Sequence, residues 1–138
     1  MNRITAITLF TLASLAAIGT ASAQERAVRS TVPFNFTVGG KVLPAGTYTI
    51  SQFASGTLEI ENRETKVAVL SVAFSDSHEA GSGGKLVFNK YGDQYFLKEV
   101  LCRWNGMNVQ LPPSKLEKKA KIQEADLNQN RQILVAAK

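Results

Sequence analysis

Residues 32–50 read VPFNFTVGGKVLPAGTYTI, and this stretch decides the fold expected for the chain. From residue 28 to residue 38 the apolar side chains share one parity and most polar side chains share the other, which predicts a strand with one buried face. Gly39-Gly40 predicts a turn. Pro44-Ala45-Gly46 predicts a corner, because proline presets φ and glycine tolerates positive φ.

Short strands and turns continue along the chain to residue 111. Asn105-Gly106 favours a two-residue hairpin turn, because both central residues of that turn need positive φ. No helix-length pattern lies between these strands. We therefore predict an all-β fold: an antiparallel meander of seven or eight strands that forms a small barrel or a sandwich, with a C-terminal helix. The further strands are expected at residues 47–52, 57–61, 66–74, 85–91, 94–104 and 107–111.

Two of these strands depart from simple alternation. Residues 66–74 are apolar on both parities, which predicts a strand that is covered on both faces or that changes phase at a bulge. Residues 94–104 carry two apolar sets of opposite parity, so one face of this strand is expected to be a second contact surface, such as for the C-terminal helix. The two sets are Tyr95, Leu97 and Leu101 against Phe96, Val100, Cys102 and Trp104.

The last 27 residues change character, since Pro112-Pro113 ends the final strand of the meander. Ser114 and Glu117 form the S-x-x-E pattern of a capping box, which predicts a helix over residues 115–125. Residues 133–135 could continue a helix or add a last strand. We divide the chain into a β domain at 24–111 and a basic, mostly helical tail at 112–138, and expect the tail to be separable.

The first 23 residues have the features of a signal peptide. Arg3 gives a positive start, residues 4–18 are apolar without charge, and Ala21-Ser22-Ala23 supplies the small residues before a cleavage site. The apolar run is shorter than the roughly 20 residues that a membrane-spanning helix needs. We therefore expect export to the periplasm or the outside of the cell, with no transmembrane segment after cleavage.

The charge and cysteine content narrow the class of protein. The net charge is +5, yet residues 24–111 hold nine basic and eight acidic side chains, so the basicity belongs to the tail. No basic face with interleaved aromatic side chains is visible, and nucleic acid is not expected as a partner. Cys102 is the one cysteine, which excludes an internal disulfide and predicts either a buried thiol or a pairing between chains.

Four motifs occur together in this order: Pro33-Phe34-x-Phe36-x-Val38-Gly39, Leu43-Pro44-Ala45-Gly46-x-Tyr48, Phe88-x-x-Tyr91-Gly92-x-x-Tyr95-Phe96-Leu97-x-Glu99-Val100, and Leu111-Pro112-x-Ser114-x-x-Glu117. In this combination the chain resembles a family of short exported bacterial proteins of unknown function. The resemblance covers residues 32–117. It implies export, a small β domain and a basic tail, and it carries no catalytic residues.

The side chains that catalysis or metal binding needs are scarce. His78 is the one histidine and lies in a Ser- and Gly-rich loop beside Asp76 and Glu79. A transition-metal site needs three or four rigidly held ligands, and a general base must be held at hydrogen-bond distance. We therefore predict no catalytic, cofactor-binding or metal-binding residues, no cofactor, and a protein that is not an enzyme.

Two sets of residues are candidates for contact with a ligand or partner. Aromatic and apolar side chains of the strands could line a cavity, although core packing is the simpler interpretation. Basic residues of the tail could contact an anionic surface, although a solvated helix face is the simpler interpretation. The first set is Tyr48, Tyr95, Leu97 and Trp104, and the second is Lys115, Lys118, Lys119 and Lys121.

These observations favour an exported protein with a non-catalytic structural or binding role in the cell envelope or outside the cell. A carrier for a small apolar or sugar ligand in a β-barrel cavity is the alternative. A hydrolase is the least favoured possibility. The partner, an envelope surface or another protein, stays open at this point.

Overall fold

The computed structural model describes residues 26–77, 81–126 and 131–137. The predicted signal peptide and His78 lie outside the described residues. Strands in two sheets dominate this part of the chain, one sheet curls into a half-barrel, and one α-helix lies near the C-terminus. The predicted all-β class with a C-terminal helix is confirmed. The described residues form eleven strands instead of the predicted seven or eight.

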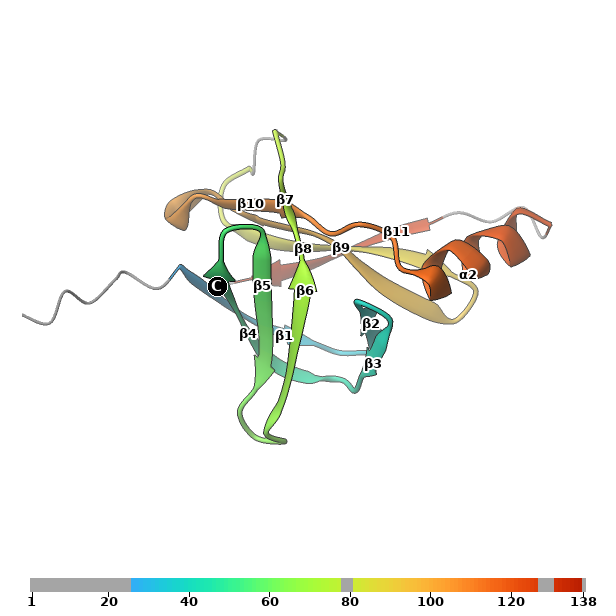
Figure 1. Ribbon diagram of the computed structural model, residues 1–138, viewed down its shortest axis with the longest axis horizontal. Helices are drawn as coiled ribbons and strands as arrows, with labels where there is room; N and C mark the ends of the chain where they lie inside the picture. The colour runs from blue at the N-terminus through green and yellow to red at the C-terminus, as the bar shows by residue number, and fades with distance from the viewer. Residues whose placement is uncertain (1–25, 78–80, 127–130, 138) are drawn as a thin grey trace, which may run out of the picture.

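The first sheet, here called sheet A, is antiparallel with the strand order β1-β4-β5-β6. Figure 1 shows its strands crossing those of the second sheet at a steep angle. Such orthogonal packing needs corners where the chain passes from one sheet to the other. The strands of sheet A are β1 (Ala27–Val32), β4 (Gly46–Ala54), β5 (Thr57–Asn62) and β6 (Val67–Val72).

The second sheet, sheet B, has the order β11-β8-β9-β10-β7, and the short β2 joins it by parallel pairing with β9. β3 pairs with β2 only, among the described residues. The strands of sheet B are β2 (Phe36–Val38), β3 (Lys41–Leu43), β7 (Phe74–Ser75), β8 (Gly84–Tyr91), β9 (Gln94–Cys102), β10 (Met107–Gln110) and β11 (Arg131–Ala137).

The chain crosses between the sheets at two breaks in strands. The single strand predicted for residues 28–38 is wrong: β1 ends at Val32 in sheet A and β2 begins at Phe36 in sheet B. Pro33 at this break has no N–H for a ladder, so pairing stops there. The second break is at Ala73, between β6 and β7.

The core lies between the two sheets and is built around aromatic rings. Phe36 packs edge-on against Tyr48 at 5.0 Å and against Phe88 at 5.5 Å between ring centroids. Edge-to-face geometry is the favoured arrangement for aromatic pairs. All three rings are buried. The space between the sheets is therefore filled by side chains, including Val28, Val32, Leu43, Ile50, Leu58, Ile60, Leu86, Val100, Cys102 and Met107.

A bulge in β9 overturns the parity predicted for residues 94–104. Leu97 pairs with Phe88 but Glu99 pairs with Val87, so Lys98 is an extra residue on β9. An extra residue reverses which face the flanking side chains take. Leu97 therefore lies in the main core, whereas Phe96 lies on the opposite face of sheet B in a small cluster. The expectation of two apolar faces holds, with different members.

The predicted strand at residues 66–74 is neither covered on both faces nor shifted in phase. Val69, Ser71 and Ala73 are buried, while the intervening apolar side chains are exposed. β6 is the edge strand of sheet A and pairs with β5 only, in the part of the chain that the structure describes. The solvent-exposed face of β6 carries large apolar side chains. The large exposed side chains are Leu70 (56%) and Val72 (55%) of β6, followed by Phe74 (60%) of β7.

The turn at Asn105-Gly106 also differs from its prediction. Cys102 pairs with Met107, so a four-residue connection containing the 3-10 turn η1 (Arg103–Asn105) replaces the two-residue hairpin turn. Gly106 takes φ 67°. The Asn105 side chain accepts from the Met107 amide at 3.0 Å and donates to the Ala27 carbonyl at 3.2 Å. Asn105 thus ties β1 to this turn.

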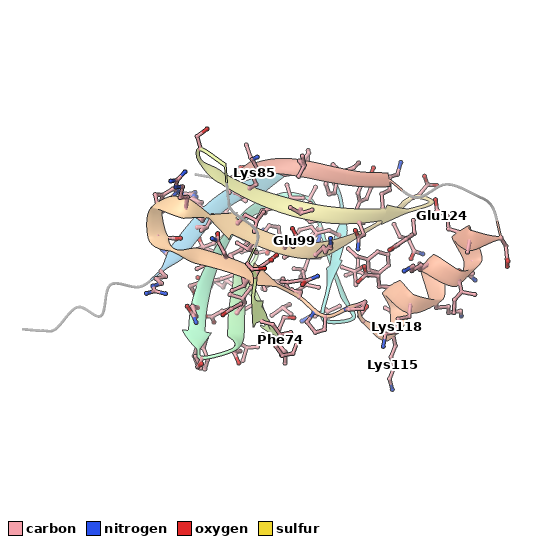
Figure 2. All side chains as sticks on the ribbon, turned by 90° about the horizontal axis from the view of Figure 1, so that it is seen from above. Phe74, Lys85, Glu99, Lys115, Lys118 and Glu124 are labelled. Atoms are coloured by element: carbon pink, nitrogen blue, oxygen red, sulfur yellow. The ribbon has the colours of Figure 1, made fainter. Side chains whose placement is uncertain are left out.

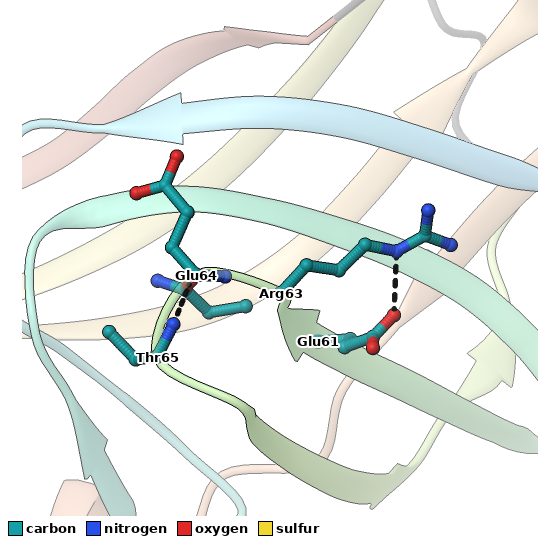
Figure 3. Close-up of polar contacts among 5 residues, drawn as sticks. Glu61, Arg63, Glu64 and Thr65 are labelled. Carbon is teal, nitrogen blue, oxygen red and sulfur yellow. Dashed lines mark hydrogen bonds and ion pairs between the residues drawn. The ribbon is translucent and has the colours of Figure 1, made fainter.

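The turn between β5 and β6 is organised by a buried asparagine. Asn62 Oδ1 accepts from the amides of Glu64 (3.0 Å) and Thr65 (3.1 Å), and Figure 3 shows this turn with the Arg63–Glu61 ion pair at 3.2 Å. A Cβ on Gly46 would lie 2.9 Å from Asn62 Nδ2. A larger residue at position 46 would therefore displace the Asn62 side chain that organises this turn.

The residues after Leu111 contribute a helix and the edge strand β11 of sheet B. The helix, α2 (Lys115–Ala125), has the predicted bounds. β11 then pairs with β8 over its whole length, and Ala137 belongs to the main core. Ser30 Oγ donates to the Ala136 carbonyl at 2.8 Å. Of the two alternatives for residues 133–135, the last strand is the one observed, and the separability of the residues after Leu111 stays a prediction.

Candidate functional site

Helix α2 lies at one end of sheet B, beside the β8–β9 turn (Figure 1). Ser114 caps it as predicted, because Ser114 Oγ accepts from the Glu117 amide at 3.1 Å. The side chain of Glu117 turns to the sheet, where its Oε1 accepts from Asn89 Nδ2 at 2.7 Å. Glu117 is buried although it is an acid.

The inner face of α2 is defined here as Glu117, Ala120 and Glu124. Ala120 packs in a cluster with Tyr91 of β8 and Phe96 of β9, and all three are buried. The small side chain lets the helix approach the sheet closely. The helix is therefore held by a methyl group, two aromatic rings and one charge-assisted hydrogen bond.

The outer face of α2 is defined here as Lys115, Lys118, Ile122 and Lys119. The helical period of 3.6 residues places these four side chains opposite the inner face. All are exposed, and Ile122 is 67% exposed. Figure 2 shows Lys115 and Lys118 on one side of the helix and Glu124 on the other. Lys121 is also exposed and lies between the two faces.

A cleft of about 600 Å³ separates α2 from the β8–β9 turn. Two of its lining side chains, Asp93 and Glu124, are acidic. Glu124 Oε2 is buried and has no hydrogen-bond partner in the part of the chain that the structure describes. A buried carboxylate oxygen without a donor is energetically unfavourable. The full lining is Tyr91, Gly92, Asp93, Gln94, Ala120, Gln123 and Glu124.

Two carboxylates of α2 act on the Tyr91 hydroxyl. Burial raises the pKa of the Tyr91 hydroxyl above its ordinary value of 10.0, and the charges of Glu117 and Glu124 raise this pKa further. Both acids lie on the inner face of α2. The two carboxylates lie two helical turns apart, and both raise the pKa of the same tyrosine.

A second, smaller hollow of about 330 Å³ lies beside Tyr91 and has the opposite character. Lys98, Lys118 and Lys121 line it together with Glu117. Lys98 is the extra residue of the β9 bulge and forms an ion pair with Glu99 at 2.7 Å. The bulge thus places a basic side chain next to the helix.

The four predicted ligand contacts do not line a common surface, because Tyr48, Leu97 and Tyr95 belong to or pack against the main core and Trp104 is exposed. Tyr48 is fully buried and its hydroxyl donates to the Pro44 carbonyl at 2.7 Å, and Leu97 is also in the core. Tyr95 stacks on Phe34 with 4.0 Å between ring centroids. Trp104 is 62% exposed in η1. Tyr48 and Leu97 therefore have no surface to offer a ligand, and the other two lie on separate elements.

Cys102 is a free, fully buried thiol of the main core. Burial raises the pKa of this thiol above 9.0. A buried, protonated thiol is a poor nucleophile and a poor partner for a disulfide. Of the two interpretations left open by the sequence, the buried thiol is the one seen here.

Sequence reasoning missed the inner face of α2. The sequence patterns place Glu117 in the capping box and Tyr91 in a turn motif, and they give no role to Glu124. Only one signal pointed to this region, the expectation that strand β9 carries a second contact face for the helix. The acids themselves give no signal, because a Glu on a helix is usually solvated.

Three further observations bear on the class of protein. Among residues 26–77, 81–126 and 131–137, no three His, Cys, Asp or Glu side chains are grouped closely enough to hold a metal ion. No helix in the same ranges has the length and apolar character needed to cross a bilayer. Comparison with protein-family models, curated proteins and solved structures finds no match to this chain.

Proposed function

We propose that the protein is an exported, non-catalytic binding module of the bacterial cell envelope that attaches to an anionic lipid surface through the outer face of α2. The observation that carries the proposal is the exposure of three lysines around an exposed isoleucine on one side of a helix whose other side is docked. Docking fixes the direction of these lysines, so the helix presents them as one surface. Export is supported by the signal-peptide pattern of residues 1–23.

The expected affinity is modest. Each lysine near an anionic membrane contributes roughly 1 kcal/mol. Lys115, Lys118, Lys119 and the flanking Lys121 together contribute about 4 kcal/mol, which corresponds to a dissociation constant of about 1 mM. Contact of Ile122 with the headgroup region adds to this. Attachment is therefore reversible and strongly weakened by salt.

The experiment is co-sedimentation of the mature protein with vesicles. Binding is expected to vesicles that contain phosphatidylglycerol, and not to vesicles of phosphatidylcholine alone. The triple substitution Lys115→Glu, Lys118→Glu, Lys119→Glu should abolish binding, and about 0.5 M salt should do the same. Unchanged binding of the triple variant would overturn the proposal.

A matched control removes the same charge elsewhere. Arg29, Lys41 and Arg103 are exposed on other elements, and replacing all three with Glu gives the same net charge. This control should retain most of the binding if the outer face of α2 is the contact surface. Equal loss in both variants would show that only net charge matters. Thermal unfolding of both variants checks that each is folded.

A further inference from the structure

The smaller hollow beside Tyr91 gathers basic side chains around a confined space. Its volume is about 330 Å³, and Lys98, Lys118 and Lys121 are among its lining residues. We propose that this hollow binds a phosphate diester group that carries one negative charge, as in the headgroups of phospholipids. The choice of a phosphate diester among anions rests on the proposed attachment to lipid, whereas the anion site itself is argued from the hollow.

The three lysines reach the hollow from two elements. Lys118 and Lys121 are three residues apart on α2, and Lys98 belongs to β9. Lys98 is the extra residue of the bulge in β9. Bulges re-aim side chains and are common beside functional sites. Three positive charges around one hollow repel one another, and an anion bound between them would offset that repulsion.

The charge of the lining fits an anion with a single negative charge. Three lysines and one glutamate, Glu117, give the lining side chains a formal net charge of +2. Lys98 is paired with Glu99 at 2.7 Å, so including Glu99 lowers this net charge to +1. A phosphate diester carries one negative charge. Its charge therefore matches the local excess of positive charge.

Donors are available on both walls of the hollow. An ammonium group carries three N–H donors, and the ion pair with Glu99 occupies one of those on Lys98. The amide group of Asn89 carries two N–H donors, and its hydrogen bond to Glu117 at 2.7 Å uses one. The tetrahedral oxygens of a phosphate group accept donors from several directions, whereas a carboxylate accepts near one plane.

The hollow adjoins the surface proposed to contact lipid. Lys118 belongs both to the lining and to the outer face of α2. A lipid headgroup can therefore enter the hollow while its acyl chains stay in the bilayer. The volume of about 330 Å³ is near the lower end of the roughly 300–1,000 Å³ of ligand pockets, which suits a headgroup and not a whole lipid.

The test is an NMR titration of the ¹⁵N-labelled mature protein with dimethyl phosphate, a diester with one negative charge, at constant ionic strength. Trimethyl phosphate is the uncharged probe, and acetate is the carboxylate probe. Dimethyl phosphate should shift the backbone amides of residues 98–99 and 117–121 in a saturable manner, and the other two probes should leave them unchanged at equal concentration. The absence of a saturable shift, or equal shifts with acetate, would overturn the proposal.

Variants separate the hollow from general charge. Lys121→Gln should weaken dimethyl phosphate binding about three- to fivefold, as expected for one exposed charge pair. Lys119→Gln removes the same charge from an exposed residue of the same helix outside the lining, and should bind as the parent does. Equal affinities of these two variants would contradict a specific site.

Lys98→Gln should weaken dimethyl phosphate binding more than Lys121→Gln, because the Lys98 side chain is only 28% exposed and its charge is less screened. If Lys98→Gln fails to fold, Lys121→Gln decides alone, since it leaves the ion pair of Lys98 intact.

Vesicles distinguish a lipid headgroup from a soluble diester as the source of the phosphate. In co-sedimentation with phosphatidylglycerol vesicles, weaker binding by Lys98→Gln than by the exposed control Lys41→Gln would assign the hollow to a headgroup. Equal vesicle binding by these two variants would assign it to a soluble diester, and either result agrees with the proposed site.

A last variant separates this site from the proposed function. The double substitution Lys115→Glu, Lys119→Glu changes the outer face of α2 and leaves the lining of the hollow intact. It should weaken vesicle binding and still bind dimethyl phosphate. Failure of lipid attachment and failure of the hollow are therefore distinguishable.

Discussion

The two faces of α2 carry opposite charge and meet different surroundings. Glu117 and Glu124 face sheet B, where one accepts a hydrogen bond from Asn89 and the other lines the cleft. Lysines dominate the outer face, in contact with solvent. The inner and outer faces of the helix therefore differ much more in charge than in hydrophobicity. A helix can be docked with very little apolar surface when a small residue allows close approach and an acid finds a donor.

The strongest way to break this comparison is to place the same new charge on each face. Ala120→Asp puts a carboxylate between Tyr91 and Phe96, which have no charge to pair with it. The free energy of unfolding should fall by about 2–3 kcal/mol, as expected for an unpaired buried charge. Urea denaturation measures this loss.

The matched substitution is Ile122→Asp on the outer face of the same helix, where the side chain is 67% exposed. It should change the free energy of unfolding by less than about 0.5 kcal/mol, because surface substitutions away from special features have small effects. Similar losses in the two variants would mean that α2 is not docked through Ala120.

A smaller loss of stability is expected when the buried acid Glu117 is replaced. Glu117→Ala leaves Asn89 Nδ2 without its acceptor at 2.7 Å, and should reduce the free energy of unfolding by about 1.5–3 kcal/mol. Glu117→Gln retains one acceptor oxygen and should cost less. Lys119→Ala, on the outer face, is the control and should be close to neutral. A neutral Glu117→Ala variant would show that the hydrogen bond does not hold the helix.

The smallest effect expected is a dependence on alkaline pH. The pKa of Tyr91 is raised in the folded state, so the fold favours its neutral form. The resulting stability is present below the ordinary pKa of 10.0 and is lost as the pH rises through the raised value. Unfolding measured between about pH 9 and pH 11 should show a smaller loss in Tyr91→Phe than in the parent.

Tyr48 and Cys102 also have raised pKa values and act in the same direction. The Tyr91→Phe variant should therefore keep part of the alkaline loss. Glu117→Gln should lower the pKa of Tyr91, because one of the charges that raises it is removed. An unchanged ultraviolet titration of Tyr91 in that variant would contradict the electrostatic cause.

Local patterns predicted much of the fold. Alternation identified most strands, and the capping pattern at Ser114 gave the bounds of α2, since each depends on a few adjacent residues. The bulge at Lys98 was not predictable, because an extra residue is defined by the pairing of β9 with β8. The exposed face of β6 was not predictable either, because apolar side chains at a sheet edge look like core residues in the sequence.

The candidate site was predicted only in part. The lysines of the tail were predicted as contacts and are exposed. Of the predicted ligand contacts, Tyr48 and Leu97 are instead core residues. Docking of α2 depends on Ala120 and on two acids, and none of these residues is apolar enough to mark a buried face. The cleft is formed by elements separated in the sequence, the turn at residues 92–93 and the helix at 115–125. Their proximity depends on the packing of the whole fold, so no local sequence pattern predicts it.

The hydrogen bond from Ser30 to the Ala136 carbonyl has a consequence for folding kinetics. It joins residues 106 apart in sequence, and closing a loop of that length costs about 4 kcal/mol in chain entropy. The hairpins β4–β5–β6 and β8–β9 close short loops, so they form early, and β11 docks late. Substitutions in β11 should therefore act mainly on the unfolding rate and little on the folding rate, so the last strand governs how long the native protein persists.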